Sequence, residues 1–386
     1  MNKTLGPKIS IILPCLNEEE TIGSCIEEII EMARLNHYDV EIIVADNGST
    51  DRSIAISRGY GVHVENVEIK GYGSAIQAGI AVARAEYVVI GDSDSSYDFR
   101  HTPRFIEALE NGADLVMGNR FKGTIHKGAM PKLHRYIGNP ILSFLARLMF
   151  RIPLGDFHCG LRAVRKTAYL KAAPITTGME FATEMIIRLA QAGVEIIEVP
   201  TDLRVDGRTR KPHLRSFPDG WRHLKLMLLY SPKLLQIYPG AFLFALGFGG
   251  SLQYIRSGQI NLVFASGSLQ TGLISLLFLF LGSQLFVSGT LNIEYAKSKG
   301  ILRFQSPSIF VRLLKSKSAL FLSIAIFLFG FIYYVPLLEL WKSSGYSYLD
   351  PSTSSRRSFG LVLSSLLSFQ LLLSSLQIRQ FTSRFW

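Results

Sequence analysis

Acidic side chains are almost absent from the last part of this 386-residue chain. Residues 234–386 contain only Glu294, Glu339 and Asp350 against 12 Lys and Arg, so they carry +9 of the formal net charge of +11. Residues 1–233 are nearly neutral, at +2. Basic residues that flank apolar segments indicate contact with anionic lipid. A nucleic-acid surface needs a basic face interleaved with stacking aromatics, which the sequence lacks, so we expect no nucleic-acid partner.

Cysteine is also scarce. Cys15, Cys25 and Cys159 form neither a Cys-x-x-Cys pair nor a zinc-ligand spacing, which favours small buried side chains in a reducing compartment. The apolar run at 9–13 is too short for a signal peptide and leads into a cluster of glutamates. We therefore expect the residues before the membrane segments to remain in the cytosol.

Four long uncharged runs occupy the basic part of the chain, at 234–255, 267–291, 318–338 and 358–378. Each has the roughly 20 residues that a helix needs to cross the hydrocarbon core. A buried core helix is the alternative for any one run, but four together predict a multi-pass integral membrane domain at 232–386. Residues 1–231 then form a catalytic domain ahead of it.

The distribution of cations predicts the sidedness of the membrane domain. The loop at 294–317 holds Lys297, Lys299, Arg303, Arg312, Lys315 and Lys317. The positive-inside rule places this loop, and with it the catalytic domain, on the cytoplasmic side. Arg356 and Arg357 fall on the opposite side and depart from the rule. Serines in the last run predict packing between membrane helices and leave open a homo-oligomer formed through them.

Residues 8–120 alternate between short Ile/Val-rich runs and amphipathic stretches. The runs at 8–13, 40–45 and 87–90 predict strands, and 19–35 and 74–84 predict helices. This alternation predicts an α/β domain with a mostly parallel central sheet and helices on both faces. Ligands of such sheets bind at the carboxyl ends of the strands. The polar clusters at 14–18, 46–51 and 92–94 lie at those ends.

Two later segments are amphipathic and basic, at 134–151 and 217–230. In the first, a stripe of Ile137, Ile141, Phe144, Leu145 and Leu148 opposes His134, Arg135, Arg147 and Arg151. In the second, Trp221, Leu224, Leu228 and Leu229 alternate with Arg222, His223 and Lys225. Each is either an ordinary core helix or an interfacial helix on a membrane surface, and the nearby apolar runs favour the second interpretation.

Two carboxylates one residue apart, Asp92 and Asp94, follow the strand expected at 87–90. Side chains two apart in a strand point the same way, so these charges repel each other. A divalent cation held between them and a nucleotide diphosphate would relieve the repulsion. We therefore expect Mg²⁺ or Mn²⁺ as cofactor, with Asp92 and Asp94 as metal ligands. An acidic loop without a ligand is the alternative.

A series of motifs resembles the catalytic domain of glycosyltransferase family 2. The motifs are Pro14-Cys15-Leu16-Asn17-Glu18, Asp46-Asn47-Gly48-Ser49-Thr50-Asp51 and Asp92-Ser93-Asp94. Two more, Asp156-Phe157-His158-Cys159-Gly160-Leu161-Arg162 and Glu180-Phe181-Ala182-Thr183-Glu184, are similar to the polyprenyl-phosphate branch, with dolichyl-phosphate mannose synthase and polyprenyl-phosphate glucosyltransferase. The resemblance implies a nucleotide-binding domain of the glycosyltransferase-A type. It also implies inverting transfer of one hexose from a nucleotide sugar (GDP-mannose or UDP-glucose type) to a polyprenyl or dolichyl phosphate.

The resemblance also assigns residues to the two substrates. On the donor side it implies Pro14, Leu16, Glu18, Asp46, Ser93 and the two aspartates, with Arg208 and Lys211 over the donor phosphates. On the acceptor side it implies that Arg120, Arg135 and Asn139 bind the lipid phosphate, since Arg suits bidentate donation to phosphate. The catalytic set is then Asp92, Asp94, Arg120 and Arg135. A solvated loop is the alternative for the basic run at 204–215.

Some roles stay unassigned. Where the family often carries a further carboxylate or amide, this chain has Ser95 and Ser96, so the other metal ligands are open. A phosphate monoester has its second pKa at about 6 and is already ionised, so no carboxylate is assigned as a base. Glu184 either orients the acceptor end of the site or pairs with Arg162.

Two other functions compete with this interpretation. A processive polysaccharide synthase would carry Gln-x-x-Arg-Trp on an interfacial helix, whereas this chain has Gly220-Trp221-Arg222-His223. A non-catalytic module could sense nucleotide and translocate lipid. Pure binding seldom needs a metal pair, so Asp92 and Asp94 favour an enzyme.

Overall fold

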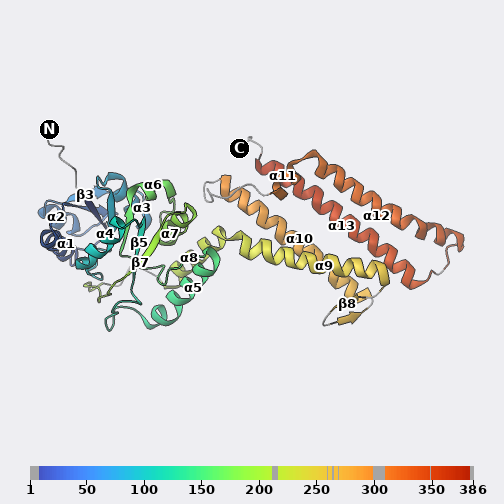
Figure 1. The fold of residues 1–386 in the computed structure, drawn as a ribbon, viewed down its shortest axis with the longest axis horizontal. Coiled ribbons are helices and arrows are strands. Elements are labelled where there is room, and N and C mark those ends of the chain that lie inside the picture. The colour runs from blue at the N-terminus through green and yellow to red at the C-terminus, as the bar shows by residue number, and fades with distance from the viewer. Residues whose placement is uncertain are drawn as a thin grey trace. The chain divides into compact units, whose positions relative to one another are not determined.

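The computed structural model describes residues 8–210, 216–258, 260–262, 265–267, 269–298, 309–347 and 349–382. The chain divides into two compact units, Met1–Met227 and Leu228–Trp386. Figure 1 draws the first unit in blue to green and the second in yellow to red. We describe each unit by itself.

A seven-stranded sheet forms the centre of the first unit, in the order β3-β2-β1-β4-β6-β5-β7. The pairs β1–β2, β1–β4, β2–β3 and β5–β7 are parallel, and β6 is antiparallel to β4 and β5. The predicted mostly parallel sheet is confirmed. The strands are β1 (Ile9–Cys15), β2 (Val40–Asp46), β3 (His63–Asn66), β4 (Tyr87–Ile90), β5 (Leu115–Asn119), β6 (Arg162–Arg165) and β7 (Ile196–Pro200).

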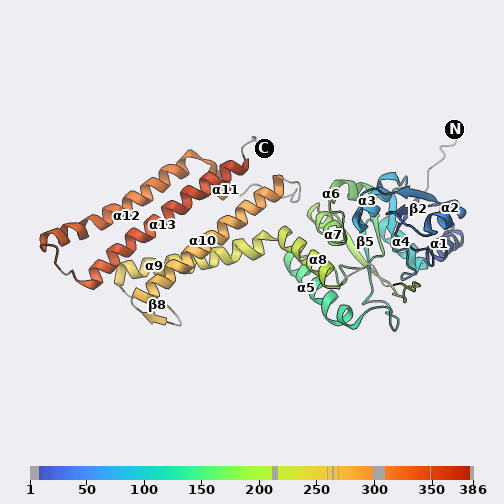
Figure 2. The ribbon, with the colours of Figure 1, turned by 180° about the vertical axis from the view of Figure 1, so that it is seen from behind.

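Helices connect the strands and pack on the sheet (Figure 2). α3 packs against β1 and β2, and α4 packs against β4, β5 and β6. A Cβ at Gly79 of α3 would lie 2.6 Å from the Ile12 side chain, so this close approach requires glycine. The helical segments are α1 (Ile22–Asn36), α2 (Ser53–Gly59), α3 (Tyr72–Val82), η1 (Phe99–His101), α4 (Thr102–Glu110), η2 (His134–Gly138), α5 (Asn139–Phe150), α6 (Lys166–Ala172), α7 (Phe181–Gln191) and α8 (Ser216–Tyr230).

A buried ion pair lies within α7. Glu184 is fully buried, and its Oε1 lies 2.7 Å from Nε of Arg188, one turn later. The other oxygen accepts hydrogen bonds from the backbone N–H groups of Ile175 and Thr176. The prediction that Glu184 pairs with Arg162 is wrong, because Arg162 donates to the carbonyls of Cys159 and Ala182 instead.

The two amphipathic segments differ in what they bury. In η2 and α5 the apolar stripe is exposed, including Ile137, Ile141, Phe144 and Leu148. In α8 Trp221 is exposed, but His223 is buried together with Leu226 and Met227. The expectation that His223 belongs to the polar face of α8 is therefore wrong. A membrane-surface role for either helix stays a prediction.

The second unit contains four helices long and apolar enough to cross a membrane: Lys233–Ser257, Leu269–Ser298, Lys317–Ser343 and Pro351–Gln380. They match the four predicted runs, while Lys299 and Arg303 of the basic loop lie outside the described residues. The elements are η3 (Lys233–Ile237), α9 (Tyr238–Ser257), β8 (Ile260–Leu262), β9 (Ala265–Gly267), α10 (Leu269–Ser298), α11 (Ile309–Lys315), α12 (Lys317–Ser343) and α13 (Pro351–Thr382).

Glycines allow α9 and α10 to pack side by side (Figure 1). A Cβ at Gly247 would lie 2.2 Å from the backbone N of Leu279, and one at Gly282 would lie 2.2 Å from that of Phe244. Small residues let membrane helices approach closely, as these do. Arg357 at the start of α13 donates to the Tyr333 carbonyl at 2.9 Å, so this cation has a partner within the unit.

Replacing Arg188 with methionine should destabilise the first unit. The change leaves the buried Glu184 carboxylate without its guanidinium, which costs about 3–5 kcal/mol. Unfolding of the first unit by urea can be followed by pulse proteolysis of the full chain in detergent. The urea concentration at the midpoint should fall. The control Lys8→Met breaks an exposed pair with Glu110 and should leave the midpoint unchanged. Equal midpoints for both variants would contradict a stabilising role for the buried pair.

Candidate active site

Several chain segments meet at one edge of the sheet. β1, β2, β4, β5 and β7 all run the same way, so the segments that follow them lie at that edge. Because β6 runs the opposite way, the segment that precedes it, at 156–161, comes to the same edge. The sheet therefore brings together the motifs that the sequence places far apart.

Asp92 lies directly after β4 in a closely packed position. The hydroxyl of Tyr72 donates to its Oδ1 at 3.0 Å. A Cβ at Gly160 would lie 2.3 Å from Oδ2, so the 156–161 segment can approach this carboxylate only with glycine there. Burial, and then the charge of Asp94, raise the pKa of Asp92 to about 6. A cation near the two carboxylates would lower the free energy of their charged forms.

Asp94 is buried and already contacts one cation from the chain. Its Oδ1 accepts hydrogen bonds from the backbone N–H and the hydroxyl of Ser96, at 3.0 and 2.5 Å. Its Oδ2 pairs with Nη2 of Arg208. Nη1 of the same guanidinium lies 3.0 Å from Glu18 Oε1. Burial disfavours the charged guanidinium, but Asp94 and Glu18 outweigh this effect and raise the pKa of Arg208.

The loop that carries Arg208 follows β7 and lies over the segment after β1. Nη2 of Arg210 donates to Glu18 Oε1 at 2.7 Å and to the Leu16 carbonyl at 3.0 Å. Burial raises the pKa of Glu18, which the two arginines partly counteract. The structure thus brings Leu16, Glu18, Asp94 and Arg208 together. Lys211 lies outside the described residues.

The other predicted donor residues lie at the ends of β1, β2 and β4. The carboxylate of Asp46 accepts hydrogen bonds from the backbone N–H groups of Gly48 and Ser49, at 2.9 and 3.1 Å. Gly48 has a φ of +92°, a conformation that favours glycine. The Ser93 hydroxyl donates to the Pro14 carbonyl at 2.7 Å, tying the segment after β4 to the end of β1. A base-binding role for Asp46 stays a prediction.

The candidate acceptor residues lie less closely together. Arg120, just after β5, makes a two-pronged pair with Asp156, Nε to Oδ2 at 2.7 Å and Nη2 to Oδ1 at 2.8 Å. Burial alone would raise the pKa of Asp156, but the guanidinium holds it below its usual range. Arg135 lies on η2 over the Tyr136 ring, and Asn139 begins α5. Within residues 8–210, no hydrogen bond or ion pair joins Arg120 to either of them.

The donor set fits a divalent cation. Oδ2 of Asp92 accepts no hydrogen bond from the described residues, and Asp94 already attracts a positive charge. The described residues hold no group of three or more His, Cys, Asp or Glu side chains arranged for a metal ion. Asp92 and Asp94 would therefore supply the protein ligands, and water and substrate oxygens the remainder, as Mg²⁺ commonly uses.

Sequence reasoning missed three residues of this site. Tyr72, whose hydroxyl donates to Asp92, received no role from the sequence. Asp156 holds Arg120, and His158 has a buried ring; both belong to the motif at 156–162 but received no role. An acidic residue two before a histidine was the available signal.

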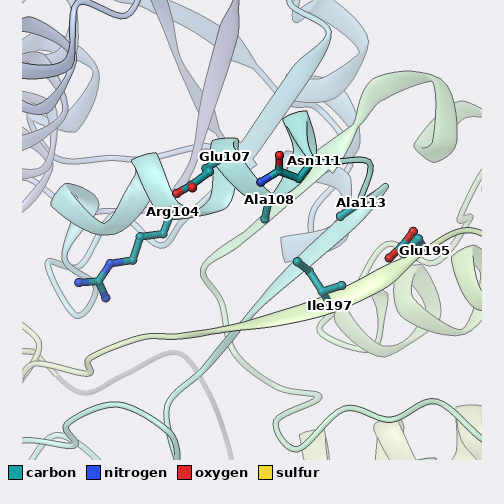
Figure 3. Close-up of a pocket in the computed structure, with 7 residues that line it drawn as sticks. All are labelled: Arg104, Glu107, Ala108, Asn111, Ala113, Glu195 and Ile197. Atoms are coloured by element: carbon teal, nitrogen blue, oxygen red, sulfur yellow. The ribbon is translucent and has the colours of Figure 1, made fainter.

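A surface pocket of about 360 Å³ lies away from these residues (Figure 3). It is lined by Arg104, Glu107, Ala108, Asn111, Ala113, Glu195 and Ile197. Ala113 and Glu195 precede β5 and β7, so the pocket is at the opposite ends of these strands from the candidate site. It contains none of the predicted substrate or metal residues.

The three cysteines are free and buried, as expected. Burial raises the pKa of Cys15 to about 12 and that of Cys25 to about 11. Neither thiol is therefore a thiolate at neutral pH, and we assign no chemistry to them.

This chain is similar in sequence to known proteins. The low-salt glycan biosynthesis hexosyltransferase of Haloferax volcanii is 35% identical over 292 residues, which cover 75% of this chain and 69% of that protein. The dolichyl-phosphate hexose transferase of the same organism is 33% identical over 198 residues, 51% of this chain and 82% of that protein.

The chain is also similar to a solved structure and matches a family model. Glucosyl-3-phosphoglycerate synthase of Mycobacterium tuberculosis, in complex with Mn²⁺, uridine diphosphate and phosphoglyceric acid, aligns with a TM-score of 0.47 and 24% identity over 58% of this chain and 78% of that chain. The family model of glycosyl transferase family 2 matches residues 10–171. The relatives and the family model together show that this chain is a glycosyltransferase and belongs to glycosyl transferase family 2.

Proposed function

We propose that this glycosyltransferase moves one hexose, with inversion, from a nucleotide sugar of the GDP-mannose or UDP-glucose type to a polyprenyl or dolichyl phosphate. A divalent cation, Mg²⁺ or Mn²⁺, is its cofactor. The observation that carries the proposal is the pair of aspartates after β4, half-buried Asp92 and buried Asp94, with Arg208 bridging Asp94 and Glu18. The relative that acts as a dolichyl-phosphate hexose transferase supports the acceptor class.

The donor side of the reaction needs charge neutralisation at the diphosphate. Asp92 and Asp94 would hold the cation, which neutralises the leaving diphosphate when it is bound. Pro14, Leu16 and Asp46, at the ends of β1 and β2, would then frame the nucleoside. This arrangement stabilises the transition state chiefly through placed charges.

Arg208 must change partners for the donor to bind. Its guanidinium lies against Asp94 Oδ2, so Arg208 would compete with a cation held by Asp94. The displaced guanidinium lies on a loop next to Leu16 and Glu18, within the region assigned to the nucleotide. It is then available to the diphosphate, a geometry for which Arg is suited.

The acceptor side needs orientation rather than a base. A phosphate monoester is largely ionised at neutral pH, so its oxygen attacks without proton removal. Nε and Nη2 of Arg120 donate to Asp156, which holds the guanidinium in place. Its Nη1 takes no part in these two bonds. Arg120 with Arg135 and Asn139 would bind this phosphate.

The membrane unit supports a lipid substrate. Four candidate spans and the exposed apolar stripe of η2 and α5 give the chain two kinds of lipid-facing surface. The cations at 294–317 favour a catalytic unit on the cytoplasmic side. Single cysteines introduced at exposed positions, and labelled with impermeant reagents in intact cells, would test that sidedness.

Transfer can be measured with the purified full chain in detergent. Labelled GDP- and UDP-sugars are supplied with a polyprenyl phosphate, and the lipid product is analysed by mass spectrometry. One sugar per lipid is expected. A polymer product would favour a processive synthase, and nucleotide binding with lipid scrambling but no transfer would favour a sensing module; either result would overturn the proposal.

Replacing Asp94 with asparagine should reduce turnover by at least about 100-fold, because one charge facing the cation is lost. Turnover is measured over a Mn²⁺ and Mg²⁺ titration, and chelation of the metal should abolish the wild-type reaction. The control Asp39→Asn changes an exposed carboxylate before β2 and should leave turnover unchanged. Full activity of Asp94→Asn would remove the metal assignment.

Replacing Arg208 with glutamine should separate metal binding from turnover. Without a guanidinium to displace, Mn²⁺ should bind about tenfold more tightly, since a charged hydrogen bond contributes on the order of 1.4 kcal/mol. Turnover should nevertheless fall, because the donor phosphates lose a cation. Calorimetry of Mn²⁺ binding and transfer assays give the two readings.

Arg204→Gln is the matched control for Arg208→Gln. Arg204 lies on the same loop but pairs with Glu28 and Asp98 rather than with Asp94. Its loss should leave the Mn²⁺ affinity unchanged. Equal Mn²⁺ affinities in Arg208→Gln and wild type would mean that Arg208 does not compete with the cation.

A further inference from the structure

Two histidines from distant parts of the chain meet beside the Arg120–Asp156 pair. His158 precedes β6 and His223 belongs to α8, and their ring centroids lie 4.8 Å apart in an edge-to-face arrangement. Nδ1 of His223 lies 2.8 Å from the hydroxyl of Thr183 on α7. His223 is therefore held from two sides, and its ring limits where the ring of His158 can lie.

His158 has hydrogen-bonding capacity that the described residues do not use. Both of its ring nitrogens are closed to solvent, and neither has a hydrogen-bond partner in the described part of the chain. Buried polar atoms nearly always have a partner, because leaving one unpaired costs free energy. The residue as a whole keeps some solvent exposure. A half-turn about χ2 exchanges each ring nitrogen with a ring carbon while the ring keeps its place against His223, so the ring has two orientations in which it can offer an N–H.

The surroundings of His158 favour an anion. Arg162 is 1% exposed, and its two terminal nitrogens donate to backbone carbonyls, which carry no net charge. Its Nε has no partner among the described residues, and no ion pair of Arg162 occurs there. Its charge acts at longer range on the Asp92 carboxylate, and a buried cation that contacts no carboxylate directly attracts an anionic ligand.

A direct chain of bonds connects His158 to the predicted acceptor arginine. Oδ1 of Asp156 accepts from Nη2 of Arg120 at 2.8 Å and from the backbone N–H of His158 at 3.1 Å. One carboxylate thus fixes both residues. Burial and the neighbouring His223 hold the pKa of His158 well below its usual range, so the ring is neutral and carries one N–H donor.

We propose that His158 binds the phosphate of the lipid acceptor next to Arg120, and that His223 is a positioning residue that orients its ring. The ligand is a phosphate monoester, and a neutral imidazole N–H donates to one of its oxygens. The nearby Arg162 supplies positive charge. This inference rests on the proposed function, because it assumes that the acceptor carries such a phosphate.

The test compares variants of the full chain in detergent. His158→Leu should raise the KM for polyprenyl phosphate about tenfold and leave the KM for the nucleotide sugar within about twofold, since one hydrogen bond to an anion is lost. His158→Gln keeps an N–H donor and should recover most of the acceptor affinity. His101→Leu, which removes a half-buried histidine on η1, is the control and should change neither KM.

A binding measurement separates this inference from the proposed function. Calorimetry follows a short-chain polyprenyl phosphate binding to wild type and to His158→Leu, with no donor present. Binding by wild type that weakens about tenfold in His158→Leu supports the inference even before transfer is measured. Equal binding by the two proteins would overturn it, and so would a donor KM raised as much as the acceptor KM. Transfer by wild type with an unchanged His158→Leu would leave the proposed function standing and refute the inference alone.

His223→Ala tests the positioning role. Because His223 orients His158 rather than touching the phosphate, the acceptor KM should rise by less than in His158→Leu. In the His158→Leu background, the same change should have no further effect on the acceptor KM. Additive effects of the two substitutions would mean that His223 acts independently and would overturn the positioning role.

Discussion

The repulsion between buried carboxylates at one edge of the sheet is the constraint on which the candidate site depends. Asp92, Asp94 and Glu18 lie at neighbouring strand ends, and burial raises the pKa of Asp92 and of Glu18. Without a cation this arrangement would favour protonation or opening of the loops. Arg208 supplies that cation from a loop more than a hundred residues along the chain from Asp94. The position of the loop after β7 therefore depends on the negative charge of Asp94 and Glu18, which Arg208 contacts.

The same kind of compensation recurs on the acceptor side with a different result. The charge of Arg120 is neutralised by Asp156, whereas Arg162 makes its hydrogen bonds to uncharged carbonyls. Among the described residues, Arg162 therefore forms no ion pair, although its charge also acts on Asp92. In the proposed reaction, an anionic acceptor would bring negative charge to this guanidinium.

The sheet, and the edge at which the motifs meet, could be predicted from the sequence, because apolar strand runs are followed by polar clusters. The buried ion pair of α7 could also have been predicted, since Glu184 and Arg188 have the four-residue spacing of helical ion pairs. The four-residue β6 was not, because its sequence Arg-Ala-Val-Arg has no distinctive period. The burial of His223 could not be predicted from the helical period of α8. It results from contacts with Thr183 and His158, which lie far away in the sequence.

The reversed direction of β6 has a consequence for the segment that carries the exposed apolar stripe. All residues between β5 and β6 form one excursion that leaves the sheet at Arg120 and returns through Asp156 and Gly160. The exposed apolar stripe of α5 lies inside this excursion, and its two ends are clamped together by the Arg120–Asp156 pair. The two ends of the excursion that carries the stripe are therefore joined through a single ion pair, next to the strand ends that carry Asp92 and Asp94. Removing that pair would release both ends of the excursion at once, without changing a strand of the sheet.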